Sequence, residues 1–291
     1  MGGSGRWYLL ESGGGGTRTH DLPVKSRKLY QLSYAPRSGR IIPVCPLPPR
    51  LPPRNPSARQ GALPAIRPRR GRGVELPVGR IVVIAGTDAG IGKTHVTARL
   101  AKYCRSRGVA VRAVKLIETG TPVEPSPTED GVVIARAAGQ EAPRAALRRY
   151  RAPAAAAEAA DREGRPVDLD AMVGEVRSIA REASITLVEG AGGLLSPITW
   201  RRTLVDVARV LKAPVIVVAA DRLGTINHTL LTVSALELAG VACLGVVMNR
   251  IPGDLRDATQ GNNLEALKQV SPALRVVATA ADGWESAVLG R

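Results

Sequence analysis

The chain has 291 residues, of which 44% are hydrophobic, so it is long enough for one large domain or two small ones with a sizeable core. The formal net charge is +16, but residues 1–80 hold 15 Lys and Arg against 3 Asp and Glu, whereas the remainder holds 26 against 22. The charge of the remainder is close to balanced, and we expect that part to bind neither nucleic acid nor a membrane.

Residues 1–80 do not have the composition of a folded domain. They contain 12 of the 22 prolines, and basic stretches such as PVCPLPPRLPPRNPSARQ favour loops. We expect a disordered tail, and an arm that binds nucleic acid or membrane is the alternative. In a third interpretation, residues 17–36 resemble the translated antisense strand of a transfer-RNA gene. The natural start would then lie shortly before Ile81, at Val74 or Val78.

Residues 81–291 form the expected folded domain, in which strands and helices alternate. The expected strands are 80–86, 109–117, 185–193 with its glycine turn, 213–220, 241–250 and 274–279. The expected helices are 93–108, 129–139, 169–183, 227–240 and 263–270. Because these strands are apolar almost throughout and alternate with helices, we expect an α/β fold with a mostly parallel sheet covered by helices on both faces.

Polar residues stand at the ends of several of these strands. Asp88, Lys115, Glu189 and Asn249 each lie at the end of an expected strand or just after it. Ligands of parallel sheets bind at the carboxyl ends of the strands. We therefore expect these four residues to gather along one edge of the sheet.

The segment GTDAGIGKT, residues 86–94, connects the first strand to the first helix. It ends in the Gly-Lys-Thr of a phosphate-binding loop, although Thr87 stands at the first glycine position of the standard pattern. Backbone amides at the start of a helix attract anions, so Lys93 is expected to pair with the β- and γ-phosphates and Thr94 to ligate Mg²⁺. The segment predicts a P-loop NTPase-like fold; an ordinary glycine-rich turn is the alternative.

Three further residues are candidates for chemistry beside the phosphates. In VEGAGG, residues 188–193, Glu189 ends a strand and is a candidate metal ligand, and the glycines leave room for a γ-phosphate. The alternative is a solvated acidic turn. Asp130 is by itself an unremarkable helix cap. Lys115 either extends to solvent or stabilises charge during phosphoryl transfer.

Taken together, these residues resemble the dethiobiotin synthetases, the ATP-dependent carboxylases of biotin biosynthesis. The family loop G-T-D-T-x-V-G-K-T is matched by residues 86–94, and K-P-V-x-[ST]-G is matched by residues 115–120. The turn E-G-x-G-G is matched by residues 189–193, and L-G-x-I-N-H by residues 223–228. The family also has an Asp at the start of the next helix, where this chain has Asp130.

The resemblance covers about residues 81–280, with departures. Leu116 and Ile117 replace the Pro and Val of the family lysine motif. Ala156 and Ala157 replace a Pro and a His of the family's substrate loop. Near the C-terminus the segment L-G-x-I-P, which helps hold the nucleotide base, has no clear counterpart.

The resemblance implies a reaction in which 7,8-diaminopelargonate adds CO₂ at one amine to give a carbamate. The γ-phosphoryl group of ATP passes to the carbamate oxygen, and the second amine closes the cyclic urea, releasing ADP and phosphate. No covalent enzyme nucleophile is needed, so positioning and charge neutralisation determine the rate.

The resemblance also implies roles for single residues. Lys93 and Lys115 are catalytic, and Lys115 contacts the carbamate and the transferring phosphate. Mg²⁺ is held by Thr94, Asp130 and Glu189. The implied nucleotide-binding residues are Gly90, Ile91, Gly92, Lys93, Thr94, His95, Asp130, Glu189, Gly190, Ala191, Gly192, Arg250 and Asn249, which reads the base edge. The implied substrate-binding residues are Thr87, Lys115, Thr119 and Asn227.

Three other functions remain open. Partitioning or septum-placement ATPases carry a signature lysine where this chain has Asp88, which argues against them. A cobyrinate-type amide synthase needs a glutaminase domain, for which the chain after residue 250 is too short. A catalytically degenerate homologue would account for the departures. The resemblance implies a homodimer in which residues 223–228 lie near the interface.

The spacing of the cysteines and the length of the apolar runs indicate the cellular compartment of the protein. Cys45, Cys104 and Cys243 are far apart and form no paired motif, which is typical of a reducing compartment. No apolar run approaches the ~20 residues of a membrane helix. The N-terminus lacks the apolar stretch of a secretory signal, so we expect a cytoplasmic protein.

Overall fold

The computed structural model describes residues 79–250 and 262–289. All of these residues belong to one compact unit, Arg70–Arg291. The tail expected over residues 1–80 lies outside the described residues except for its last two. Its disorder, its possible binding role and the alternative starts therefore stay predictions.

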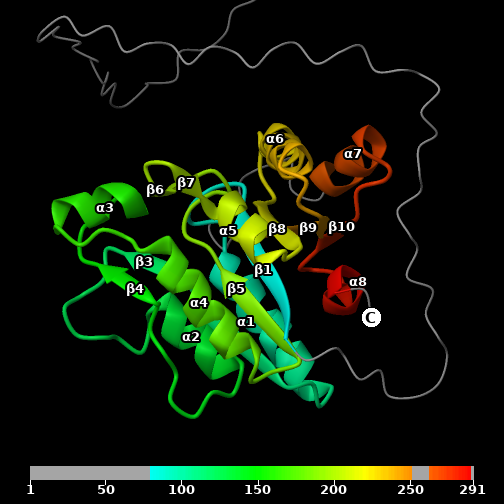
Figure 1. Ribbon diagram of the computed structural model, residues 1–291. Helices are drawn as coiled ribbons and strands as arrows, with labels where there is room; N and C mark the ends of the chain where they lie inside the picture. Colours follow the sequence, from blue (N-terminus) through cyan, green and yellow to red (C-terminus); the bar gives the residue numbers. More distant parts are fainter. Residues whose placement is uncertain (1–78, 251–261, 290–291) are drawn as a thin grey trace, which may run out of the picture. The chain divides into compact units, whose positions relative to one another are not determined.

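A six-stranded parallel sheet forms the centre of the unit (Figure 1). Its strands are β1 (Arg80–Gly86), β2 (Val111–Lys115), β5 (Ile185–Glu189), β8 (Val215–Ala220), β9 (Cys243–Asn249) and β10 (Val276–Ala278). Their order across the sheet is β10-β9-β8-β1-β5-β2, so β1 lies between β8 and β5. The loop that follows β1 therefore emerges near the middle of the sheet.

The strands are apolar on both faces because helices cover both faces. Along β1, Val82 and Ile84 belong to one hydrophobic cluster, and Val83 and Ala85 belong to the other. On the side of Val82 the covering helices are α1 (Lys93–Ser106), α2 (Asp130–Ala137) and α8 (Trp284–Leu289). On the other side they are α4 (Leu169–Ala180), α5 (Leu204–Leu211), α6 (Thr225–Leu238) and α7 (Asn262–Val270). The predicted α/β fold is confirmed.

Two small sheets lie beside the main one. The first is a parallel pair of β3 (Ile117–Thr119) and β4 (Arg148–Tyr150), and the second is an antiparallel pair of β6 (Pro197–Thr199) and β7 (Arg202–Thr203). The short helix α3 (Ala156–Arg162) contacts β3, β4 and β6. These elements form the part of the unit next to the carboxyl end of β2.

The expected strand over residues 109–117 is wrong in its extent, because the chain changes sheets at Leu116. The Leu116 amide donates to the carbonyl of Glu189 in the main sheet (3.0 Å), whereas its own carbonyl accepts from the Arg148 amide of the small sheet (3.1 Å). The other expected elements are present with shifted ends. Elements that the sequence analysis did not predict are α3, α5, α8, β3, β4, β6 and β7.

Helix α5 is one of the helices that the sequence analysis missed. It spans only eight residues, and a capping box starts it: the Thr203 amide donates to Asp206 Oδ2 (2.9 Å), and the Asp206 amide donates back to the Thr203 side chain. None of the described helices is long and apolar enough to cross a membrane.

Candidate active site

The loop between β1 and α1 has the backbone shape of an anion-binding loop. Gly90 and Gly92 have positive φ angles of 67° and 86°, a region that favours glycine. Helix α1 starts at Lys93, so its first amides face the loop. The Lys93 ammonium donates to the carbonyl of Asp88 across the loop (2.9 Å).

Lys115, Asp130 and Glu189 form a cluster of charges beside this loop. The register of the sheet places Lys115 opposite Glu189, at the carboxyl ends of β2 and β5. The Lys115 Nζ lies 2.6 Å from Glu189 Oε1 and 2.6 Å from Asp130 Oδ2. The Thr94 hydroxyl, on the first turn of α1, donates to the same Glu189 Oε1 (2.8 Å). The cluster therefore joins β2, β5, α1 and α2 at one point.

Burial and neighbouring charges shift the pKa values of Lys93 and Lys115 in opposite directions. Burial, and then the charge of Lys115, lower the pKa of Lys93 to about 8. Burial would lower the pKa of Lys115 as well, but the charges of Glu189 and Asp130 more than offset this and raise it. Lys115 is thus held as a cation although only 5% of its side chain is exposed.

Asp130 is the first residue of α2 and faces Lys115. Burial alone would raise the pKa of Asp130, but the Lys115 ammonium outweighs that effect and holds the pKa below its usual value. Behind it, Glu118 accepts hydrogen bonds from the amides of Asp130 (2.8 Å) and Gly131 (3.1 Å). Burial raises the pKa of Glu118, partly offset by those two hydrogen bonds.

A cavity of about 380 Å³ opens between the loop and this cluster. Its lining residues are Ala89, Gly90, Gly92, Lys93, Thr94, Lys115, Ile117, Glu118, Thr119, Asp130, Ala191 and Gly192. The structure thus brings together at one cavity both lysines, Thr94, Asp130 and Thr119. Glu189, the third candidate metal ligand, is not among the lining residues; it is buried and contacts Lys115 and Thr94.

Other predicted nucleotide-site residues lie around the loop rather than on the cavity. The Asn249 side chain is buried below the loop and donates to the carbonyl of Ile91 (3.0 Å). Arg250 is exposed, and its guanidinium lies 3.9 Å from Asp221. Gly190 packs so closely on α5 that an added Cβ would lie 2.2 Å from Leu204 Cδ2.

Three further predicted site residues do not line the cavity. His95 is exposed on the first turn of α1, and burial, Arg99 and Lys102 together lower its pKa. Thr87 directly follows β1, and its amide donates to the Val218 carbonyl (2.9 Å). Asn227 is exposed on α6.

The sequence analysis missed Glu118, which lines the cavity. The available signal was its place between Lys115 and Thr119, in a polar segment that follows a buried strand. Its partners lie 12 and 13 residues further along the chain, so only the folded structure reveals the contact.

Oxygen donors at the cluster suit a small, hard cation. Glu189 Oε2 is buried and has no hydrogen-bond partner among the described residues. These residues include no group of three or more His, Cys, Asp and Glu that could hold a metal ion. Mg²⁺ is usually bound through one or two carboxylates plus substrate phosphates, so Asp130, Glu189 and the Thr94 hydroxyl fit this ion.

Residues 80–280 match the family model described as an AAA domain. The chain is similar to the ATP-dependent dethiobiotin synthetase of Anaeromyxobacter dehalogenans, with 43% identity over 174 residues, which are 59% of this chain and 77% of the relative. The corresponding protein of Mycobacterium sp. strain KMS is 42% identical over 195 residues, 66% of this chain and 84% of the relative. The Aquifex aeolicus protein is 34% identical over 192 residues, 66% and 86% of the two chains.

Proposed function

The chain belongs to the ATP-dependent dethiobiotin synthetase family, and from this premise we propose how its residues divide the reaction. It is an ATP-dependent ligase that forms dethiobiotin from 7,8-diaminopelargonate and CO₂. The relatives support this activity over a partitioning ATPase.

The loop between β1 and α1 holds the polyphosphate of ATP in this proposal. Its glycines allow the backbone to approach the phosphates, and the first amides of α1 face them. Lys93 exchanges the Asp88 carbonyl, which it contacts at 2.9 Å, for phosphate oxygens. Gly190, Ala191 and Gly192 border the γ-phosphate, while Asn249 and Arg250 lie toward the base.

Lys115 serves the chemical step. It lies in the cavity wall between the phosphate loop and Thr119, which binds the acid substrate together with Thr87. Transfer of the γ-phosphoryl group to the carbamate oxygen concentrates negative charge, and a cation already held in place stabilises it. The single observation that carries the assignment is the contact of Lys115 Nζ with both carboxylates at 2.6 Å, which keeps this lysine charged and fixed.

Mg²⁺ is the proposed cofactor, held by Thr94, Asp130 and Glu189. When bound, it neutralises charge on the β- and γ-phosphates. The buried, unpartnered Glu189 Oε2 supports this assignment among the described residues. We also propose a cytoplasmic location.

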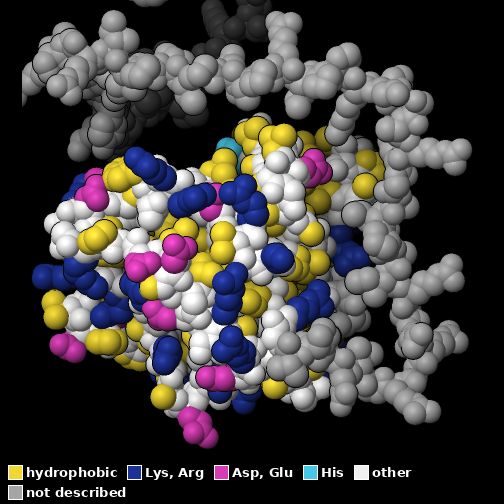
Figure 2. Space-filling view, viewed as in Figure 1, with side chains coloured by type: hydrophobic (Ala, Val, Ile, Leu, Met, Phe, Trp, Pro, Cys, Tyr) yellow, Lys and Arg dark blue, Asp and Glu magenta, His cyan; other side chains and the backbone are white. Residues whose placement is uncertain are grey.

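A homodimer formed through α6 is the proposed assembly. Leu231 and Leu238 are exposed by 62% and 85% and lie on the same side of α6 as Asn227. Leu223, exposed by 77%, directly precedes the cap of this helix. Figure 2 shows hydrophobic side chains gathered over this helix. Large exposed apolar surfaces mark interaction sites, and pairing here would bring Asn227 toward a second copy's substrate.

The activity is tested by incubating the protein with ATP, Mg²⁺, diaminopelargonate and bicarbonate and detecting dethiobiotin by mass spectrometry. ATP hydrolysis should rise only when the diamine and bicarbonate are both present. Lys93→Ala should nearly abolish turnover, with a fall of about a hundredfold or more, since one lost charge contact of this kind costs on the order of 3 kcal/mol or more in the transition state. Hydrolysis stimulated by DNA or vesicles but not by the diamine would contradict the proposal.

A further inference from the structure

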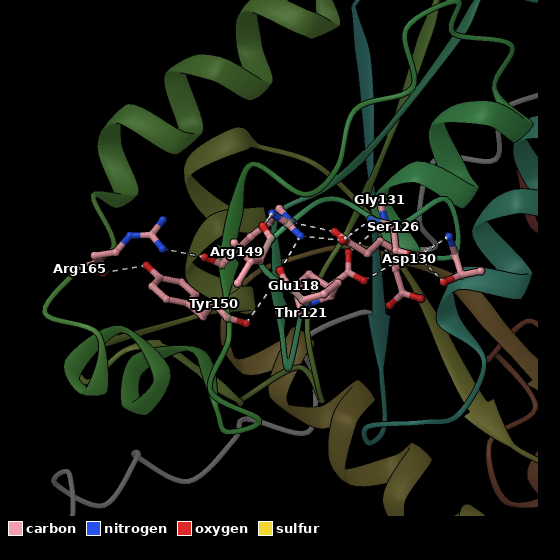
Figure 3. A network of polar contacts seen from close by, with 12 residues as sticks. Glu118, Thr121, Ser126, Asp130, Gly131, Arg149, Tyr150 and Arg165 are labelled. Atoms are coloured by element: carbon pink, nitrogen blue, oxygen red, sulfur yellow. Dashed lines mark hydrogen bonds and ion pairs between the residues drawn. The ribbon is translucent and has the colours of Figure 1, made fainter.

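Helix α2 begins at the active site, yet the donors of its first turn are satisfied from another element. The amides of Asp130 and Gly131 donate to the two carboxylate oxygens of Glu118, which lies on β3 (Figure 3). Amides at a helix start need external acceptors, and a side chain from the same turn usually provides one. Here a strand 12 residues earlier provides both acceptors.

The segment from Lys115 to Glu118 therefore contacts both the side chain and the backbone of Asp130. The Asp130 carboxylate lies 2.6 Å from Lys115 Nζ, and the Asp130 amide lies 2.8 Å from Glu118 Oε1. Because Lys115 and Glu118 are three residues apart, the backbone and the side chain of Asp130 are fixed by the same stretch of chain.

The small sheet strengthens this arrangement. Glu118 is the register partner of Arg149 on β4, and Arg149 forms a two-pronged ion pair with Glu129 (2.6 and 2.8 Å). Figure 3 shows these residues as one network that reaches the start of α2. Glu129 directly precedes Asp130, so neighbouring positions of β3 and β4 fix consecutive residues of the helix start.

The first turn of α2 also packs closely against the backbone of a neighbouring segment. A Cβ on Gly131 would lie 2.5 Å from the Ala146 amide nitrogen and 2.7 Å from the Ala145 carbonyl carbon. The first turn of α2 is thus both held by Glu118 and packed tightly on the backbone of residues 145–146. Loss of Glu118 would remove the acceptors of the first two amides of α2, next to the cavity.

We infer that Glu118 is a positioning residue, which sets the place of the Asp130 carboxylate in the metal site by holding the first two amides of α2. This inference rests on the proposed function, in which Asp130 is a metal ligand. Groups that orient a metal ligand from behind contribute about 10- to 100-fold to metal affinity.

The test compares ADP affinity in excess Mg²⁺ with ADP affinity in EDTA, by calorimetry. The ratio of the two affinities reports the metal site, and the EDTA value reports the phosphate loop. Glu118→Ala should lower the ratio by about tenfold and change the EDTA affinity by less than about twofold. Glu118→Gln, which keeps one acceptor oxygen, should fall between Glu118→Ala and the wild type.

Glu163→Ala is the matched control. Glu163 also accepts two consecutive backbone amides, from Arg151 (2.5 Å) and Ala152 (3.0 Å), but it lies away from the charge cluster. Its loss should leave the ratio unchanged. If Glu118→Ala does not fold, the Gln variant gives the decisive measurement.

Asp130→Ala separates the inference from its premise. A lower ratio in Asp130→Ala together with a normal ratio in the Glu118 variants would overturn the positioning role and leave the metal assignment intact. A normal ratio in Asp130→Ala would remove Asp130 from the metal site and overturn both. An equal loss of the ratio in Glu163→Ala would show general destabilisation and would also overturn the inference.

Discussion

The side-chain amide of Asn249 fills the space that a side chain on Gly92 would need. A methyl carbon added to Gly92 would lie 2.1 Å from Asn249 Nδ2, the nitrogen that donates to the Ile91 carbonyl at 3.0 Å. The end of β9 therefore supports the phosphate loop from below, and the loop keeps its shape only while residue 92 has no side chain.

Gly92→Ala should weaken ADP binding by at least about tenfold, because a non-glycine residue at φ 86° costs on the order of 1–3 kcal/mol before the clash is counted. Calorimetry measures the affinity. Gly108→Ala is the control: Gly108 ends the same helix at φ 70°, but an added methyl there meets no atom within 4 Å. It should lower stability modestly and leave ADP affinity unchanged. Normal ADP binding by Gly92→Ala would contradict this account of the loop.

Lys115→Gln should separate binding from chemistry. Nucleotide affinity should stay nearly intact, because Lys93, Thr94 and the loop amides still hold the polyphosphate. The rate of cyclic urea formation in a single turnover should fall by about a hundredfold or more, as for loss of one fixed charge at a developing anion. Parallel loss of ATP binding would reassign Lys115 to the nucleotide site, and a normal rate would remove its catalytic role.

Leu231→Glu should convert a dimer to a monomer, since it places a charge in the middle of the exposed leucines of α6. Light scattering after size exclusion measures the mass. Val210→Glu, at an exposed position of α5, is the control and should leave the mass unchanged. A monomeric wild-type protein would rule out the proposed assembly.

Removal of residues 1–73 should leave turnover and thermal stability unchanged, because that segment has no core-forming pattern in its sequence. Melting temperature and dethiobiotin formation of the truncated and full-length chains provide the comparison. A large loss of active protein would show that the segment contributes to the fold.

The sequence was most informative where a feature is local. Periodicity identified the strands of the main sheet, and the Gly-Lys-Thr of residues 92–94 identified the phosphate loop. Because the carboxyl ends of parallel strands share one edge, the positions of Lys115 and Glu189 in the sequence also predicted that they would meet, as they do at 2.6 Å.

Features that depend on contacts between distant segments were not predictable. The expected strand 109–117 continues after Lys115 with the apolar residues Leu116 and Ile117, so nothing local marks the change of sheet at Leu116. Helix α5 is a different case, because Thr203 and Asp206 have the spacing of a capping box before an apolar run, a signal that is present in the sequence. The role of Glu118 could not be predicted, because its hydrogen-bond partners belong to a helix that lies beyond an intervening loop.

The change of sheet at Leu116 divides the molecule into two modules at the level of a single residue. Lys115 ends a strand of the main sheet, whereas Thr119 belongs to the small sheet. In the proposed function the first serves phosphoryl transfer and the second binds the acid substrate. An insertion at this junction would shift the two modules out of register. A substitution confined to Thr119 would instead alter the acceptor side of the proposed site and leave Lys115, Glu118 and Asp130 in place. The junction thus places two residues of one cavity, Lys115 and Thr119, on different sheets.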